Sequence, residues 1–254
     1  MHCHNSKFGL IGYPLGHSYS KDHFSSKFER EGLTKCHYEN FEIESIGLID
    51  KIIRDHTDLV GLNVTIPYKQ AIIPFLDCID PVARKIAAVN TIKISRSGSQ
   101  IVLKGYNTDV VGFTKSLDRW SFDKPIRALV FGTGGSSQAI KYALKQRCID
   151  FISVSRNHAK GLMTYGAITK EIASDYKLWI NCTPVGMFPG ISGLLPLPYR
   201  FLTRNHYLFD LVYNPEVTGF IRQGKEAGAS VMNGLVMLYE QAEASWKIWT
   251  EESA

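Results

Sequence analysis

Two residues in the first half of the chain could exchange a proton with a substrate. Lys69 closes the segment Asn63-Val64-Thr65-Ile66-Pro67-Tyr68-Lys69, where an apolar strand ends and a proline suits the first position of a helix. The helix dipole disfavours a positive charge in that first turn, which suits a lysine that exchanges protons near neutral pH. Asp109 closes Gly105-Tyr106-Asn107-Thr108-Asp109 at a second strand-to-helix junction and could orient the Lys69 ammonium. An exposed lysine and an ordinary helix cap are the alternatives.

A pair of hydroxyls could bind an anion. Ser18 and Ser20 stand close together in Gly12-Tyr13-Pro14-Leu15-Gly16-His17-Ser18-Tyr19-Ser20, just ahead of a predicted helix. Both hydroxyls and the helix N-terminus could face a carboxylate, because unpaired backbone N–H groups and the helix dipole favour negative charge there. Ser20 could equally be an N-cap that binds no ligand.

A glycine turn in the second half predicts a dinucleotide site. The apolar run 127–131 is followed by Gly132-Thr133-Gly134-Gly135 and then by a helical pattern. Gly132 permits the tight turn, and the later glycines let backbone N–H groups approach a pyrophosphate at the helix N-terminus. The third glycine position of this motif is Ser137, and Ala139 could provide the close helix-to-strand packing instead. A strand-turn-helix unit without a ligand is the alternative.

The end of the next strand bears on the choice of nicotinamide cofactor. NAD sites usually place an acid about twenty residues after the glycines to accept from the ribose 2′-hydroxyl. Here that region reads Val154-Ser155-Arg156-Asn157, with Lys160 close behind. Arg156 cannot accept from a hydroxyl, but it could bind a 2′-phosphate through charge-assisted hydrogen bonds. The pattern therefore favours NADP over NAD, with a solvated loop arginine as the alternative.

The composition is that of an ordinary globular protein with room for two domains. The chain has 254 residues, 44% of them hydrophobic, and a net charge of +5. The charge fits an anionic substrate, and no run of Lys and Arg interleaved with aromatics predicts nucleic-acid binding. Five scattered cysteines without a C-x-x-C pair favour reduced thiols, a cytoplasmic location and no metal site. No apolar run is long enough to predict a membrane span.

Short apolar runs alternate with helical patterns, which predicts an α/β fold. In the first half, strands are predicted at 8–11, 38–41, 59–64, 89–94 and 101–105, with a helix from about Ser20 and a hairpin at 97–99. In the second half, strands at 128–131, 151–154, 178–181 and 207–212 accompany helices at 138–145 and 217–226. Two further helices are predicted at 109–119 and 234–249, the latter with apolar residues every three or four positions.

Further blocks complete a specific pattern. They are Ala88-Val89-Asn90-Thr91, Asn181-Cys182-Thr183-Pro184-Val185-Gly186-Met187, Tyr213 with Pro215, and Asn233-Gly234-Leu235-Val236-Met237-Leu238 followed by Gln241-Ala242. Together with the segments above, and in this order over nearly the whole chain, they resemble the shikimate dehydrogenase family of NADP-dependent enzymes in aromatic amino-acid biosynthesis. Each block alone is a weak signal, whereas the ordered set is a strong one.

The resemblance implies a fold and an activity. It implies an N-terminal α/β substrate domain over residues 1–108, completed by the C-terminal helix 234–254, and a Rossmann-type NADP domain over residues 109–233. It also implies the reversible reduction of 3-dehydroshikimate to shikimate with NADPH, as part of chorismate biosynthesis. The implied partners are small molecules only, with no nucleic acid and no membrane, and the protein would be a monomer or homodimer.

The resemblance also implies roles for individual residues. Lys69 would be the acid/base with Asp109 as its partner, and Ser18 and Ser20 would bind the substrate carboxylate. The residues around the ring hydroxyls would be Asn63, Thr65, Asn90, Tyr213 and Gln241. The residues that bind NADP would be Gly132, Thr133, Gly134, Gly135, Ser136, Arg156, Lys160, Leu211 and Gly234.

The chain departs from the family pattern at several positions. Lys21 stands where proline is usual, and the segment from Arg156 to Asn181 is shorter than usual, which predicts a trimmed helix-strand unit and leaves cofactor affinity open. Two other functions stay open. A quinate/shikimate dehydrogenase using NAD is disfavoured by Arg156, and a non-catalytic NADP-sensing paralogue is disfavoured by Lys69 and Asp109.

Overall fold

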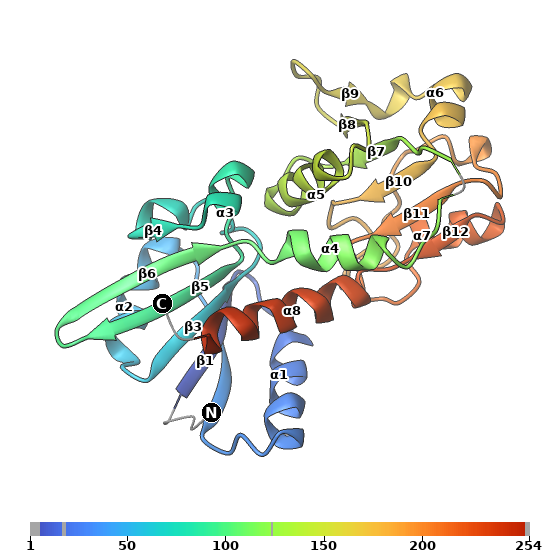
Figure 1. Cartoon of the computed structure of the whole chain (residues 1–254). Coiled ribbons are helices and arrows are strands. Elements are labelled where there is room, and N and C mark those ends of the chain that lie inside the picture. Colours follow the sequence, from blue (N-terminus) through green and yellow to red (C-terminus); the bar gives the residue numbers. More distant parts are fainter. Residues whose placement is uncertain (1–5, 17–18, 123, 252–254) are drawn as a thin grey trace. The chain divides into compact units, whose positions relative to one another are not determined.

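The structure, a computed structural model, describes residues 6–16, 19–122 and 124–251. It divides into two compact units, one formed by Met1–Gly112 with Tyr239–Ala254 and the other by Phe113–Leu238. Each unit has its own β-sheet (Figure 1). The divisions fall inside two helices, α4 (Asp109–Leu117) and α8 (Leu235–Thr250), so most of the last helix belongs to the first unit.

The sheet of the first unit is mixed and has the strand order β2-β1-β3-β5-β6-β4. The strands are β1 (Ser6–Gly12), β2 (Cys36–Glu42), β3 (Leu59–Val64), β4 (Cys78–Ile79), β5 (Thr91–Ser97) and β6 (Gln100–Tyr106). β1 pairs in parallel with β2 and β3, whereas β5 pairs antiparallel with β3 and β6. The predicted hairpin is confirmed, because Ser97 pairs with Gln100 at the turn between β5 and β6.

Helices cover both faces of this sheet. α2 (Ile49–Asp55) and α3 (Pro81–Ile86) pack into one core with strand residues such as Ile11 and Leu62. α1 (Tyr19–Arg30) and α8 contribute Phe24 and Trp249 to a second core, which also contains Phe8 of β1. Burying one large apolar side chain contributes about 1.5–3 kcal/mol. The last helix is therefore fixed to a unit whose other residues lie far earlier in the chain.

The helix predicted to begin at Pro67 is not formed. Residues 66–72 make turns, followed by the short 3₁₀ helix η2 (Ile73–Phe75). The carbonyl of Lys69 accepts a hydrogen bond from the backbone N–H of Val89 at 2.7 Å. It therefore does not accept the hydrogen bond from residue 73 that an α-helix would require. Pro74 removes a further backbone donor. The predicted helix dipole is therefore absent at Lys69, and side-chain partners must orient this residue.

The second unit contains a parallel sheet with the strand order β12-β11-β10-β7-β8-β9. The strands are β7 (Ala128–Phe131), β8 (Phe151–Ser155), β9 (Met163–Thr164), β10 (Leu178–Asn181), β11 (Tyr207–Asp210) and β12 (Ser230–Met232). Counted from β7, this is the strand order of a Rossmann fold, whose ligand site lies where the order reverses, between β7 and β10. The predicted Rossmann-type fold is confirmed.

The helices of the second unit vary widely in length. They are α5 (Gly135–Gln146), α6 (Lys170–Asp175) and α7 (Gly219–Glu226), together with the 3₁₀ helices η3 (Tyr165–Ala167) and η4 (Tyr199–Phe201). Between Arg156 and Asn181 the chain keeps a strand and a helix, but β9 has two residues and α6 has six. The trimming relative to the family that the sequence predicted for this segment stays a prediction.

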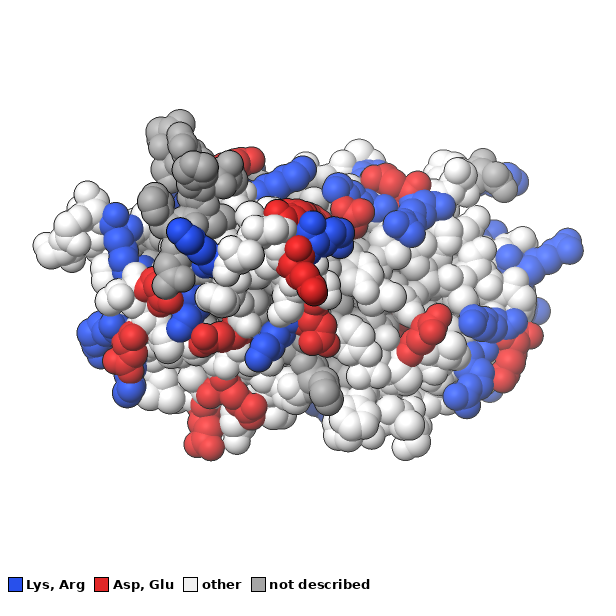
Figure 2. All heavy atoms as spheres, turned by 90° about the horizontal axis from the view of Figure 1, so that it is seen from below, with Lys and Arg blue, Asp and Glu red and all other residues white. Residues whose placement is uncertain are grey.

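Positive and negative side chains are mixed on the face of the molecule that Figure 2 shows. Lys and Arg side chains are interspersed with Asp and Glu there, so no continuous basic stripe is visible on that face (Figure 2). In the part of the chain that the structure describes, no helix is long and apolar enough to cross a membrane. Within the same residues, no group of three or more His, Cys, Asp or Glu side chains could hold a metal ion.

Candidate active site

Lys69 and Asp109 form a close ion pair in the first unit. Lys69 Nζ lies 2.5 Å from Asp109 Oδ2, and the two side chains are 14% and 5% exposed. Lys69 comes from the turn that follows β3, and Asp109 is the first residue of α4. A partly accessible ammonium held by a buried carboxylate can donate a proton to a bound ligand or accept one from it.

Asn90 holds the second oxygen of Asp109. Its Nδ2 donates to Asp109 Oδ1 at 2.9 Å, and its Oδ1 accepts from the backbone N–H of Thr108 at 2.7 Å. A backbone N–H can only donate and an ionised carboxylate can only accept, so the Asn90 amide has one possible orientation. Asp109 is therefore bound at both oxygens, which aims one of them at Lys69.

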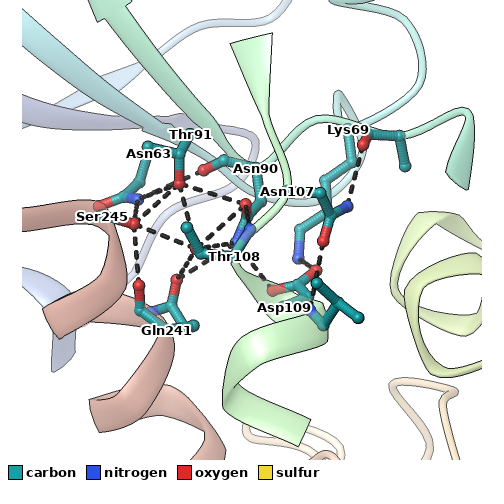
Figure 3. A network of polar contacts seen from close by, with 11 residues as sticks. Asn63, Lys69, Asn90, Thr91, Asn107, Thr108, Asp109, Gln241 and Ser245 are labelled. Carbon is teal, nitrogen blue, oxygen red and sulfur yellow. Dashed lines mark hydrogen bonds and ion pairs between the residues drawn. The ribbon is translucent and has the colours of Figure 1, made fainter. Parts of the chain in front are cut away.

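Gln241 and Asn63 belong to the same polar network (Figure 3). Asn90 Nδ2 lies 3.3 Å from the side-chain oxygen of Gln241, which α8 brings to the first unit. Asn63, on β3, donates through Nδ2 to Ser245 Oγ at 3.0 Å. The structure thus brings together five of the predicted residues, namely Asn63, Lys69, Asn90, Asp109 and Gln241.

The network also contains four buried residues to which the sequence interpretation gave no role. They are Tyr38, Thr91, Thr108 and Ser245. Ser245 had a readable signal, because it stands three residues after Ala242 and four before Trp249 on the buried stripe of α8. A polar residue within such a stripe must find hydrogen-bond partners in the core.

The predicted carboxylate-binding pair is described only in part. Ser18 lies outside the described residues. Ser20 lies in the first turn of α1. Burial raises the pKa of Tyr38, and the Ser20 side chain opposes that rise. Thr65 follows β3, and its methyl carbon lies only 2.5 Å from the position that a Cβ on Gly12 would take. Glycine at position 12 therefore lets Thr65 sit close to the end of β1.

The glycine turn of the second unit leads directly from β7 into α5. Gly132 has a φ of +108°, a conformation that favours glycine, and Gly134 is the N-cap of α5 with open space where a Cβ would stand. Ser137 is buried and donates to the Gly132 carbonyl at 2.7 Å, so it ties the helix to the turn. Ala139 is also fully buried, as its predicted packing role requires. The accessible N–H groups here can bind a pyrophosphate.

Arg156 and Lys160 stand at the same edge of the sheet. Both are exposed just after β8, and β8 pairs with β7 so that Val154 lies opposite Phe131. Burial raises the pKa of Tyr165, and the positive charge of Arg156 opposes that rise. A guanidinium and an ammonium beside a pyrophosphate site fit a second phosphate group. The residues of this edge therefore fit NADP.

Leu211 and Gly234 lie in direct contact. A Cβ on Gly234 would stand 2.1 Å from the Leu211 carbonyl oxygen, so only glycine allows this approach. The Gly234 backbone N–H also donates to the Val212 carbonyl at 3.2 Å. Tyr213 follows in the same loop after β11. The structure thus joins Leu211, Tyr213 and Gly234 near the carboxyl end of β11, on the second unit.

Asp210, the last residue of β11, is a fully buried carboxyl. It accepts from Thr218 Oγ1 at 2.5 Å, from Asn181 Nδ2 at 2.9 Å and from the Val212 N–H at 3.0 Å. Burial raises the pKa of Asp210 to about 6, although these hydrogen bonds oppose the rise. The carboxyl thus links the ends of β10 and β11 to the start of α7.

Comparisons with known proteins agree with this geometry. The family model for the shikimate dehydrogenase substrate binding domain matches residues 10–92. The shikimate dehydrogenase (NADP(+)) of Halothermothrix orenii is 37% identical over 265 residues, covering 95% of this chain and 90% of that protein. The chain belongs to the shikimate dehydrogenase family. The resemblance noted in the sequence is thereby confirmed.

Solved structures of this family share the fold. Shikimate dehydrogenase 1 from Peptoclostridium difficile is 35% identical with a TM-score of 0.84, covering 98% of this chain and 93% of that chain. Shikimate 5-dehydrogenase from Thermus thermophilus, in complex with NADP(H) and shikimate, is 29% identical with a TM-score of 0.83, covering 96% and 93%. A shikimate dehydrogenase fold, with an α/β substrate domain and a Rossmann-type domain, is therefore confirmed.

Proposed function

We propose that this chain is an NADP-dependent shikimate dehydrogenase, which reversibly reduces 3-dehydroshikimate to shikimate in chorismate and aromatic amino-acid biosynthesis. The observation that carries the proposal is the Lys69–Asp109 pair, held by Asn90 within a buried polar network. Relatives that cover most of the chain support the substrate and the cofactor. The presence of both Lys69 and Asp109 disfavours a non-catalytic NADP-sensing protein.

Lys69 acts on the oxygen atom at C3 of the substrate. In the reductive direction the C3 ketone gains a hydride at carbon and a proton at oxygen, and Lys69 Nζ donates that proton. In the oxidative direction the same nitrogen accepts the proton of the C3 hydroxyl. NADPH, when bound, supplies the hydride. Asp109 keeps Nζ in place through the 2.5 Å contact, and Asn90 keeps Asp109 in place.

Other polar residues bind the substrate on this proposal. Ser18 and Ser20 bind the carboxylate, because hydroxyl groups at the N-terminus of a helix suit an anion. The ring hydroxyls are bound by Asn63, Thr65, Asn90 and Gln241, which all belong to the first unit. Amide and hydroxyl side chains suit this task because each can both donate to a substrate hydroxyl and accept from it. The first unit, with α8, is thus the substrate domain.

The second unit binds NADP on this proposal. The pyrophosphate is bound by the turn Gly132-Thr133-Gly134-Gly135-Ser136 at the start of α5, and the 2′-phosphate by Arg156 and Lys160. Leu211 and Gly234 contribute the backbone surface near the nicotinamide. Exposed cations after β8, with no acid in the stretch 155–160, support NADP over NAD.

The test is an assay in which the purified chain is mixed with shikimate and NADP. The reaction is monitored by the absorbance of the reduced nicotinamide that forms. Parallel reactions contain quinate in place of shikimate, or NAD in place of NADP. We expect turnover with shikimate and NADP, and much weaker turnover in the parallel reactions. Turnover that is faster with quinate and NAD would support the alternative enzyme, and NADPH binding without turnover would support the sensor.

Two further properties are part of the proposal. We expect a cytoplasmic location and either a monomer or a homodimer, which light scattering on the same preparation distinguishes. Neither property changes the chemistry assigned to Lys69.

A further inference from the structure

Ser245 occupies the centre of the polar network in the first unit, although it carries no role in the proposed reaction. Its side chain is fully buried on α8. Its hydroxyl oxygen lies within hydrogen-bond distance of four groups: Thr91 Oγ1 at 2.8 Å, the Gln241 carbonyl at 2.9 Å, Asn63 Nδ2 at 3.0 Å and Thr108 Oγ1 at 3.1 Å. The view of Figure 3 shows these groups converging on it.

The single proton of Ser245 fixes the direction of these hydrogen bonds. The Gln241 carbonyl can only accept, so the Ser245 hydroxyl donates to it. Toward Asn63, Thr91 and Thr108 the Ser245 oxygen can then only accept, and its two lone pairs serve two of these three groups at a time. The atom of Asn63 that faces Ser245 must therefore be the amide nitrogen.

Tyr38 also constrains the orientation of the Asn63 side-chain amide, because it contacts the amide oxygen. Its phenol donates to Asn63 Oδ1 at 2.8 Å, and its ring stacks on Phe24 with centroids 4.7 Å apart. Burial raises the pKa of Tyr38 well above its usual value, so the phenol keeps the proton that it donates.

We propose that Ser245 and Tyr38 are positioning residues of the substrate site, which together set the orientation of the Asn63 amide and the place of Gln241. This inference rests on the proposed function, in which Asn63 and Gln241 bind the ring hydroxyls. An acceptor on one side and a donor on the other leave Asn63 a single orientation. Ser245 also ties α8 to β3 and β5, one helical turn after Gln241.

The same hydroxyl connects with the acid/base pair. Ser245 contacts Thr108, Thr108 contacts Asn90 at 2.9 Å, and Asn90 holds Asp109. Lys69 lies at the end of this line, beyond three intervening groups. We therefore expect that loss of the Ser245 hydroxyl mainly weakens shikimate binding and lowers the turnover number less.

The experiment compares hydroxyl-deletion variants by shikimate titration calorimetry and steady-state kinetics. Ser245→Ala and Tyr38→Phe each remove one hydroxyl and keep the rest of the side chain. The matched control is Thr250→Val, which removes a hydroxyl that makes the same type of bond on the same helix, to the Trp246 carbonyl at 2.8 Å and the Lys247 carbonyl at 3.4 Å. All variants are assayed well below their melting temperatures.

We expect each network variant to weaken shikimate binding about two- to tenfold, the usual worth of one hydrogen bond. Thr250→Val should bind shikimate as the parent chain does, and the KM for NADP should be unchanged in all three variants. Because Ser245 and Tyr38 act on one amide, the double variant should lose less affinity than the product of the two single losses.

Two outcomes overturn the inference in distinguishable ways. Ser245→Ala and Tyr38→Phe variants that are less heat-stable but bind shikimate like the parent chain would show that both hydroxyls are only structural. Failure of the parent chain itself to bind or oxidise shikimate would overturn the proposed function, and the inference with it.

Discussion

The position of α8 in the first unit depends on the absence of a side chain at Gly61. A Cβ built on Gly61 would lie 2.5 Å from Trp249 Nε1 and 2.6 Å from two further ring atoms. The ring has little freedom to move, because Nε1 donates to the Ile92 carbonyl at 2.9 Å and the ring centroid lies 5.0 Å from that of Phe8. Gly61→Ala must therefore displace the helix that carries Gln241.

The expected cost follows from this geometry. Forcing an extra methyl into a packed core costs about 1–3 kcal/mol. For a chain of this size each kcal/mol lowers the melting temperature by about 2–4 °C, so the fall should be roughly 2–12 °C. Displacing α8 also moves Gln241, so the KM for shikimate should rise while the KM for NADP stays near the parent value.

The assay combines a thermal melt with steady-state kinetics on Gly61→Ala and a matched control. Gly47, in the 3₁₀ helix η1 (Ile46–Leu48), is exposed, and the nearest atom to its built Cβ is Ser45 Oγ at 3.7 Å. Gly47→Ala should therefore keep the parent melting temperature and both KM values. A Gly61→Ala variant with parent stability and parent KM for shikimate would show that the contact with Trp249 does not fix the position of α8.

Three further predictions concern the proton donor, the cofactor and a buried acid. Lys69→Ala should lower the turnover number by about 10²–10⁴-fold, with a much smaller change in shikimate affinity, because the proton is transferred only in the transition state. Arg156→Asp should shift the ratio of kcat/KM values from NADP toward NAD, because it removes the cation assigned to the 2′-phosphate. Burial raises the pKa of Asp210 to about 6 from an ordinary 3.8, so the folded state binds this proton more tightly. Its contribution to stability is thus largest in acid and is lost as the pH rises through about 6, by up to about 3 kcal/mol, and Asp210→Asn should abolish this dependence in denaturant titrations.

Each of these predictions has a clear contrary outcome. Parent-like turnover in Lys69→Ala would remove this residue from the proton transfer. An unaltered NADP preference in Arg156→Asp would remove Arg156 from the cofactor site, and Arg204→Asp, at an exposed position of the same unit, is the charge-matched control. For Asp210, the difference in unfolding free energy between the parent chain and Asp210→Asn should change between neutral and acidic pH. A constant difference would mean that the carboxyl titrates alike in the folded and unfolded chain.

The sequence was most informative where short motifs stand at strand ends. The segment ending in Lys69 and the segment ending in Asp109 both predicted a site at a junction after a strand, and the structure brings the two side chains together. The helix predicted around Lys69 was wrong, because its carbonyl pairs with Val89, a contact that local sequence does not reveal. Tertiary hydrogen bonding overrode a helix signal that Pro67 alone had supported.

Short elements and cross-chain contacts lay beyond the reach of the sequence patterns. α3 and α6 have six residues each, and β4 and β9 have two, which is too short for a helical or alternating period to register. Ser245 contacts Asn63 only because α8 packs on β3, and the two residues are 182 positions apart in the sequence. The identity of the hydrogen-bond partner of Ser245 depends on the topology of the fold. That Ser245 needs a partner could be inferred from the sequence, because it lies within the buried stripe of α8.

The transfer of a hydride from C3 of shikimate to NADP can be measured directly. Shikimate that carries deuterium at C3 is incubated with the full-length chain and NADP, and both products are analysed by mass spectrometry. We expect one deuterium atom in the reduced cofactor and none in the 3-dehydroshikimate that forms. Deuterium that is retained in the carbon ring or released to water, or shikimate that remains unoxidised, would contradict this expectation.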